Sequence, residues 1–190
     1  MVRSSAPRRR WSLRQQASNA AATSICSRSS TAPLLERLEI RECQVLDPNT
    51  AFALQELVAR FTNSFDLKEW GRLGECLADT VHTDYSELRG TPPETMSRDQ
   101  FVELRRSALQ ELQTHHLAAN LEIDLDGGSA NLKVSMVIYR RNQAGETLNT
   151  HCLYFMRAEQ GPDGWRINSI TQKVFMSDGR TEIHKGIVKP

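Results

Sequence analysis

Residues 61–85 read FTNSFDLKEWGRLGECLADTVHTDY, a stretch that predicts a break between two amphipathic helices followed by a strand. Asp66 lies at this break, between the apolar residues Phe65 and Leu67. A carboxylate held at a helix end by apolar neighbours is less solvated than one in an open loop. We therefore expect Asp66 to face a pocket, and Tyr85 to lie where the next strand opens.

Helices are predicted on both sides of the break. Upstream, Asp47–Pro48 is a typical helix start, and apolar residues then recur at helical spacing up to the break. Downstream, a shorter helix is expected from about Lys68, with Trp70 and Leu77 in its apolar face. A third helix is expected to follow the capping box Ser97–Gln100.

Beyond the third helix the apolar period changes from helical to two, which predicts strands. Short turn signals at 126–128, 142–146 and 161–164 separate four such runs. Strands joined by turns this short are antiparallel. Together with a short strand over Val81–Leu88, helices first and a strand meander afterwards predict an α+β fold rather than a doubly wound one.

Composition is typical of a single soluble domain, with 190 residues, 39% hydrophobic and 25% charged. No apolar run approaches the roughly 18 residues of a membrane span, so a soluble, cytoplasmic protein is expected. Scattered cysteines without C-x-x-C spacing indicate free thiols rather than a metal or disulfide framework. These are Cys26, Cys43, Cys76 and Cys152.

The charge is distributed unevenly along the chain. Residues 1–35 contain six arginines and no acid, which leaves 18 basic against 23 acidic residues, a net charge of −5, for residues 36–190. We expect residues 1–45 to be a disordered basic tail or a transit-like segment, the latter indicating a mitochondrial location. The acidic body supplies no basic face with interleaved aromatic residues, so nucleic-acid binding is not expected, nor is a membrane partner.

Four motifs resemble the SnoaL-like branch of the nuclear transport factor 2-like superfamily, and within it the scytalone dehydratases. They are SFDLKEWGRL at 64–73, TDY at 83–85, MSRDQF at 96–101 and THHL at 114–117. The resemblance implies a cone of about three N-terminal helices packed on a curved antiparallel sheet that encloses a pocket. It implies a domain over 46–176, a C-terminal extension over 177–190, and a homodimer.

The same resemblance implies the residues of the site. Asp66 and His116 match the acid–histidine pair inside the pocket, and Tyr85 matches a pocket tyrosine, so these three are the expected catalytic residues. Phe65 stands where the dehydratases have a second tyrosine, and Cys152 stands where they have an asparagine. These two residues, with Tyr139, are expected to contact the substrate.

A buried carboxylate fixes the tautomer of a histidine and stabilises its cation, which lets His116 exchange a proton near neutral pH. We expect a lyase (dehydratase) or an isomerase or cyclase that uses no cofactor and no metal and acts on a hydrophobic small molecule in a largely apolar pocket. The alternative is a non-catalytic module that binds a small molecule or mediates dimerisation with the same fold. A scaffold protein is a third reading, favoured if the pocket is filled by its own side chains.

Overall fold

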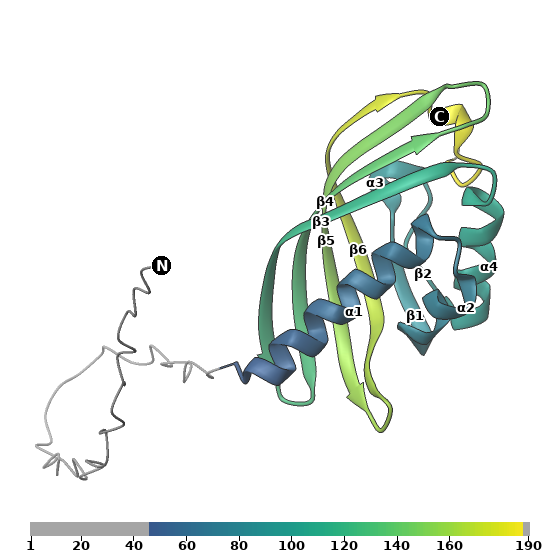
Figure 1. Cartoon of the computed structure of the whole chain (residues 1–190). Helices are drawn as coiled ribbons and strands as arrows, with labels where there is room; N and C mark the ends of the chain where they lie inside the picture. The colour runs from purple at the N-terminus through teal and green to yellow at the C-terminus, as the bar shows by residue number, and fades with distance from the viewer. Residues whose placement is uncertain (1–45, 188–190) are drawn as a thin grey trace, which may run out of the picture. The chain divides into compact units, whose positions relative to one another are not determined.

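A long helix and a strongly bent sheet define the architecture of residues 46–187, the part of the chain that the computed structural model describes (Figure 1). The predicted tail over 1–45 lies outside the described residues, apart from which only 188–190 are left out. The long helix crosses the concave side of the sheet, and two shorter helices lie beside it (Figure 1). The predicted α+β class is confirmed.

The helices begin where their caps predict. Helix α1 (Pro48–Asp66) starts after Asp47, whose carboxylate accepts a hydrogen bond from the Thr50 amide at 2.9 Å. Helix α4 (Arg98–Leu109) starts after Ser97, and both bonds of the predicted capping box with Gln100 are present. These caps satisfy amides that have no partner inside their helices.

The segment between these helices differs from the prediction. Helix α2 is only Trp70–Glu75, and Leu77 opens strand β1 (Leu77–Asp84) instead of continuing the helix. The Cys76 carbonyl accepts a hydrogen bond from the Ile167 amide at 2.8 Å, so the chain joins the sheet here. An apolar residue four positions after Leu73 fits a helix face and a buried strand start equally well, which is why the periodicity misled.

Two further short elements were not predicted. Tyr85, expected where a strand opens, instead follows the end of β1 and is the N-cap residue of the four-residue helix α3 (Ser86–Arg89). Residues 86–88, expected to continue the strand, belong to this helix, which ends at Gly90 with a φ of 72°. Strand β2 (Glu94–Ser97) then pairs antiparallel with β1. Both elements are shorter than the window over which a hydrophobic period can be recognised.

Four long strands complete the sheet, and all three predicted turns are found between them. The strands are β3 (Gln113–Asp126), β4 (Ser129–Arg141), β5 (Thr147–Gly161) and β6 (Gly164–Gly179). The order is β2-β1-β6-β5-β4-β3. All neighbours are antiparallel except β1 and β6, which are parallel, so the expectation of a purely antiparallel sheet needs this correction. No short turn links β1 to β6, and their relative direction is therefore not constrained by a hairpin.

The core lies between the helices and the inner face of the sheet. Alternate residues of β4 are buried, as their period of two predicts: Ala130, Leu132, Val134, Met136 and Ile138. Asn120 has a φ of 51°, and the β3–β4 register shifts between Ala119 and Glu122. This bulge is of the kind that bends a strand, and β3 packs against α1.

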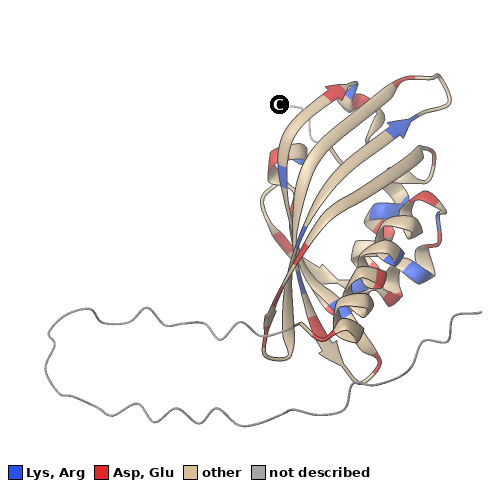
Figure 2. Ribbon diagram, turned by 60° about the vertical axis from the view of Figure 1, so that its left-hand side comes forward, with Lys and Arg blue, Asp and Glu red and all other residues tan. Residues whose placement is uncertain are grey.

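Charged residues of both signs are interspersed over the helices and the sheet (Figure 2). Of the helices described, none is long and apolar enough to cross a membrane.

Candidate active site

Asp66 is the last residue of α1, and a defined helix end fixes its position. After the C-cap residue Leu67, Lys68 takes the left-handed conformation with a φ of 59°. The Glu69 amide then donates to the Ser64 carbonyl at 3.0 Å. This is the Schellman arrangement, in which a left-handed residue turns the chain away from the helix axis.

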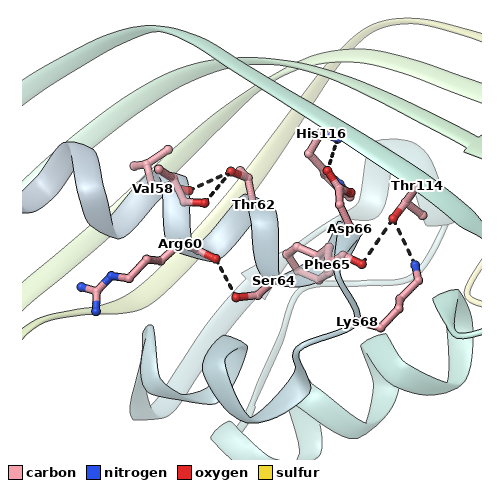
Figure 3. Close-up of polar contacts among 10 residues, drawn as sticks. Val58, Arg60, Thr62, Ser64, Phe65, Asp66, Lys68, Thr114 and His116 are labelled. Carbon is pink, nitrogen blue, oxygen red and sulfur yellow. Dashed lines mark hydrogen bonds and ion pairs between the residues drawn. The ribbon is translucent and has the colours of Figure 1, made fainter.

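His116 lies on β3 directly opposite this helix end (Figure 3). Its Nδ1 is 2.6 Å from Oδ1 of Asp66, and its backbone amide donates to Oδ2 at 2.7 Å. Because the carboxylate can only accept at Nδ1, that nitrogen carries a proton in the pair. Nε2 of the neutral ring is then left as an acceptor.

The electrostatics favour a charged Asp66 beside a neutral His116. Burial acts to raise the pKa of Asp66, but the hydrogen bonds and charge of His116 outweigh it and hold the pKa below its ordinary value. Burial lowers the pKa of His116, and the nearby charges of Arg140 and Lys68 lower it further against the opposing effect of Asp66. His116 is therefore a base at neutral pH.

Neighbouring side chains hold the pair in place. Lys68 Nζ donates to the Thr114 hydroxyl at 3.1 Å, and this hydroxyl donates to the Phe65 carbonyl at 3.3 Å (Figure 3). The Phe65 ring stacks on the His116 imidazole with centroids 5.1 Å apart. Both members of the pair are thus restrained by contacts between α1 and β3.

The His116 side of the pair borders a small cavity of about 20 Å³, which has room for about one water molecule. Its lining is more polar than the largely apolar pocket that was expected. The lining residues are Phe65, Tyr85, Leu88, Arg89, Arg105, Leu109, His116, Arg140, Tyr154, Gln172 and His184. A substrate therefore enters only when some of these side chains move.

Tyr85 lies in this cavity and is buried. Its ring meets that of Tyr154 edge to face, with centroids 6.1 Å apart. Burial raises the pKa of Tyr85 to about 12, so the hydroxyl keeps its proton at neutral pH.

Two predicted substrate contacts lie outside the cavity. Tyr139 is 42% exposed on the outer face of the sheet, where it stacks on His115 with centroids 6.3 Å apart. Side chains alternate along β4, and its neighbour Ile138 takes the inward position. Cys152 does point inward and is buried, but Gln172 lies beside it, with Nε2 3.4 Å from the sulfur, and is the residue that reaches the cavity.

Several lining residues were missed by the sequence analysis, and two of them had a recognisable signal. Arg105 lies four residues from both Phe101 and Leu109, in the middle of an apolar helix face. Arg140 continues the inward-facing series of β4 two residues after Ile138. A basic residue at a core position of a regular pattern indicates a functional constraint. His184, from the segment after β6, had no such signal.

Metal-ligating side chains do not gather in the described part of the chain, where no group of three or more His, Cys, Asp or Glu could hold an ion.

Comparisons with known proteins give a consistent result. A family model described as a SnoaL-like domain matches residues 51–171. A scytalone dehydratase-like protein from Claviceps purpurea strain 20.1 is 40% identical over 52 residues, which cover 27% of this chain and 33% of that relative. A second such protein, from Passalora fulva, is 34% identical over 53 residues, or 28% of this chain and 33% of that relative. The chain therefore spans about a third of the length of these curated relatives.

Solved structures share the fold at low sequence identity. The Kfla4162 protein from Kribbella flavida has a TM-score of 0.68 at 20% identity, over 72% of this chain and 98% of that one. A hexachlorocyclohexane dehydrochlorinase from Novosphingobium barchaimii LL02 has a TM-score of 0.60 at 14% identity, over 75% of this chain and 96% of that one. Similarity at this level concerns the architecture.

Proposed function

Because the chain belongs to the SnoaL-like domain family, within the nuclear transport factor 2-like superfamily, we propose that its pocket catalyses a cofactor-independent lyase or isomerase reaction. The observation that supports this best is the contact of 2.6 Å between Asp66 and His116, whose ring lines a small cavity. It leaves Nε2 of a neutral, buried imidazole as a base.

The reaction begins when Nε2 of His116 accepts a proton from a carbon next to a carbonyl. The electron pair of that C–H bond forms a C=C bond as the bond to a hydroxyl on the next carbon breaks. The imidazolium, stabilised by Asp66, returns its proton to the departing hydroxide. Water leaves, and His116 is neutral again. In an isomerisation, the same proton returns to a different carbon.

Tyr85 has the role of a hydrogen-bond donor in this proposal. Since its pKa is raised to about 12, it stays protonated and polarises the substrate carbonyl as negative charge develops on the oxygen. The names of two similar proteins, a scytalone dehydratase-like protein and a dehydrochlorinase, describe eliminations of water and of hydrogen chloride. Both reactions remove a proton and a leaving group from adjacent carbons.

Proton abstraction can be tested before the natural substrate is known. Diacetone alcohol, a simple β-hydroxy ketone, is incubated with the protein in deuterium oxide, and exchange of the protons next to its carbonyl is followed by NMR. We expect exchange above the buffer rate, and a loss of about 100-fold or more in His116→Asn, because a general base contributes about that much. Asp66→Asn should also lose rate, because the imidazolium loses its counter-charge.

The adjacent and exposed His115 provides the matched control, and His115→Asn should exchange at the wild-type rate. Equal rates in His116→Asn, Asp66→Asn and wild type, with all three folded, would rule out catalysis by the pair.

The small free volume of about 20 Å³ fits a scaffold protein whose pocket is filled by its own side chains. A second candidate function is a binding module with the same fold that performs no chemistry. In that case a bound ligand contacts His116 without losing a proton to it. Substituting His116 would then change ligand affinity, while no compound would exchange protons faster than in buffer.

We also propose that residues 46–176 form the catalytic domain and that the extension over 177–190 contributes His184 to its pocket. A homodimer through the outer face of the sheet is part of this proposal. Large apolar side chains are exposed on that face, among them Leu117, Tyr139 and Phe155. Exposed apolar surface of this kind is typical of an interface.

A further inference from the structure

Three arginines from three different elements line the cavity: Arg89 of α3, Arg105 of α4 and Arg140 of β4. Arg105 is 2% exposed and Arg140 is 4% exposed, which is rare for a charged side chain. None of the ion pairs recorded among residues 46–187 includes one of these three guanidinium groups.

The guanidinium group of Arg105 has no hydrogen-bond acceptor in the described structure. All three of its nitrogens are buried and unpaired. Arg105 lies over the faces of Tyr85 and Phe101, 4.8 and 4.7 Å from the ring centroids. Arg89 lies 4.4 Å from the Tyr85 centroid. Contact with aromatic rings offsets only part of the cost of burying a charge.

Arg140 is partly satisfied. One terminal nitrogen donates to the Thr150 hydroxyl at 3.0 Å and reaches the Leu148 carbonyl at 3.5 Å, while Nε is buried and unpaired. Nε of Arg89 is unpaired as well. The cavity is therefore bordered by several N–H donors of positive charge that lack acceptors.

Gln172 adds the opposite kind of group. Its Nε2 faces the sulfur of Cys152, and its Oε1 is buried without a donor. A buried acceptor of this kind matches a hydroxyl hydrogen.

We propose that the natural substrate is a small organic acid whose carboxylate is bound by Arg89, Arg105 and Arg140 and whose hydroxyl group donates to Gln172. Guanidinium groups bind planar carboxylates through paired hydrogen bonds, and such bonds are strong in a water-excluded site. The inference rests on the proposed function of the same pocket and assigns its substrate class.

Direct binding tests this class without requiring turnover. NMR titrations compare β-hydroxybutyrate with the neutral β-hydroxybutyramide, and levulinate with levulinamide. Each acid should bind at least about tenfold more tightly than its amide. Equal affinities within both pairs would overturn the proposal. Tighter binding of an alkyl phosphate than of either acid would replace the carboxylate with a phosphate.

Substitutions identify the arginine involved. Arg105→Met should weaken binding of the acids about tenfold to 100-fold and leave the amides unchanged, as expected for the loss of a charge-assisted hydrogen-bonded contact. The adjacent Arg106 is half exposed. Arg106→Met is the matched control and should retain the preference for acids. Equal loss in both variants would contradict a specific role of Arg105.

Thermal stability separates ligand binding from a structural role. Arg105→Met should melt at a higher temperature than wild type in the absence of ligand, because a buried unpaired charge is removed. A lower melting temperature would mean that Arg105 stabilises the fold. If Arg105→Met did not fold, the proposal would be tested by two other results. They are the affinity of Arg140→Met for the acids and the preference of the wild-type protein for acid over amide.

Failure of this inference is distinguishable from failure of the proposed function. The preference for acids should persist in His116→Asn, which lacks the base. A preference for acids, with no exchange of the protons next to the ketone of levulinate in the wild-type protein, would support the substrate class and reject the chemistry. Proton exchange without a preference for acids would support the chemistry and reject the substrate class.

Discussion

Both carboxylate oxygens of Asp66 accept hydrogen bonds from His116. One oxygen accepts from the ring and the other from the backbone amide. The C-terminal end of a helix carries partial negative charge, which makes this a costly place for a carboxylate. The two N–H donors of His116 and the ammonium group of Lys68 oppose that cost. These contacts hold the carboxylate of Asp66 in one orientation.

His184 is a second buried imidazole, and it should make stability depend on pH. Burial, followed by the charges of Arg140 and Arg89, lowers its pKa to about 3. In the unfolded chain the ordinary value is 6.5. The unfolded state therefore binds the proton first as the pH falls, and the free energy of unfolding decreases between about pH 6.5 and 3.

We expect His184→Asn to remove up to about 1.4 kcal/mol per pH unit of this dependence. Asparagine can keep an acceptor for the Gly186 amide, which donates to Nδ1 of His184 at 3.1 Å. Urea unfolding of wild type and variant between pH 4 and 7 measures the difference. An unchanged slope would show that His184 is not buried as a neutral ring, and the exposed His115→Asn serves as control.

At the scale of elements, two glycines should respond in opposite ways to alanine. Gly71 lies within α2, and an added Cβ would have no neighbour within 4 Å. Gly179 ends β6 with a φ of 110°, and its added Cβ would lie 2.1 Å from the Thr147 carbonyl oxygen. Chemical denaturation should find Gly71→Ala more stable by about 0.5–1 kcal/mol.

Gly179→Ala should be less stable by more than about 1 kcal/mol, because both the left-handed backbone and the close approach of β5 exclude a side chain. If both variants had similar stability, the pairing of Gly179 with Leu148 at the end of β5 and β6 would be wrong.

How much of the structure could be predicted also depends on the scale of the element. A long helix or strand contains several repeats of its apolar period, which is enough to identify it. The N-caps Asp47 and Ser97 also predict the first residues of α1 and α4. Helix α3 and strand β2 have four residues each, and their conformation depends on contacts made elsewhere in the chain. Leu77 shows the same limit, since only its pairing with Ile167 decides between helix and strand.

The candidate site was predicted in part for a related reason. A resemblance in local motifs identifies Asp66, His116 and Tyr85, which all come from the segments that carry those motifs. His184 reaches the cavity from the segment after the last strand. Its position depends on the assembled sheet, and no spacing along the chain predicts it.

At the scale of the whole molecule, the outer sheet face should determine the oligomeric state. Phe155 is 44% exposed there, and a charge at its position would be buried in an interface. If this face forms the proposed homodimer, we expect wild type to sediment as a dimer and Phe155→Asp as a monomer at the same concentration. Phe52→Asp, at an exposed site on α1, should not change the mass. Identical sedimentation of all three would remove this face as the interface.

The parallel pairing of β1 with β6 also affects how the protein is made. Asp84 pairs with Thr171, so β1 cannot complete its place in the sheet until nearly the whole domain has left the ribosome. At ordinary translation rates this delay is on the order of ten seconds. During that time β1 has only β2 beside it, because its other neighbour in the sheet is β6. We expect slower translation between β1 and β6 to lower the yield of folded protein.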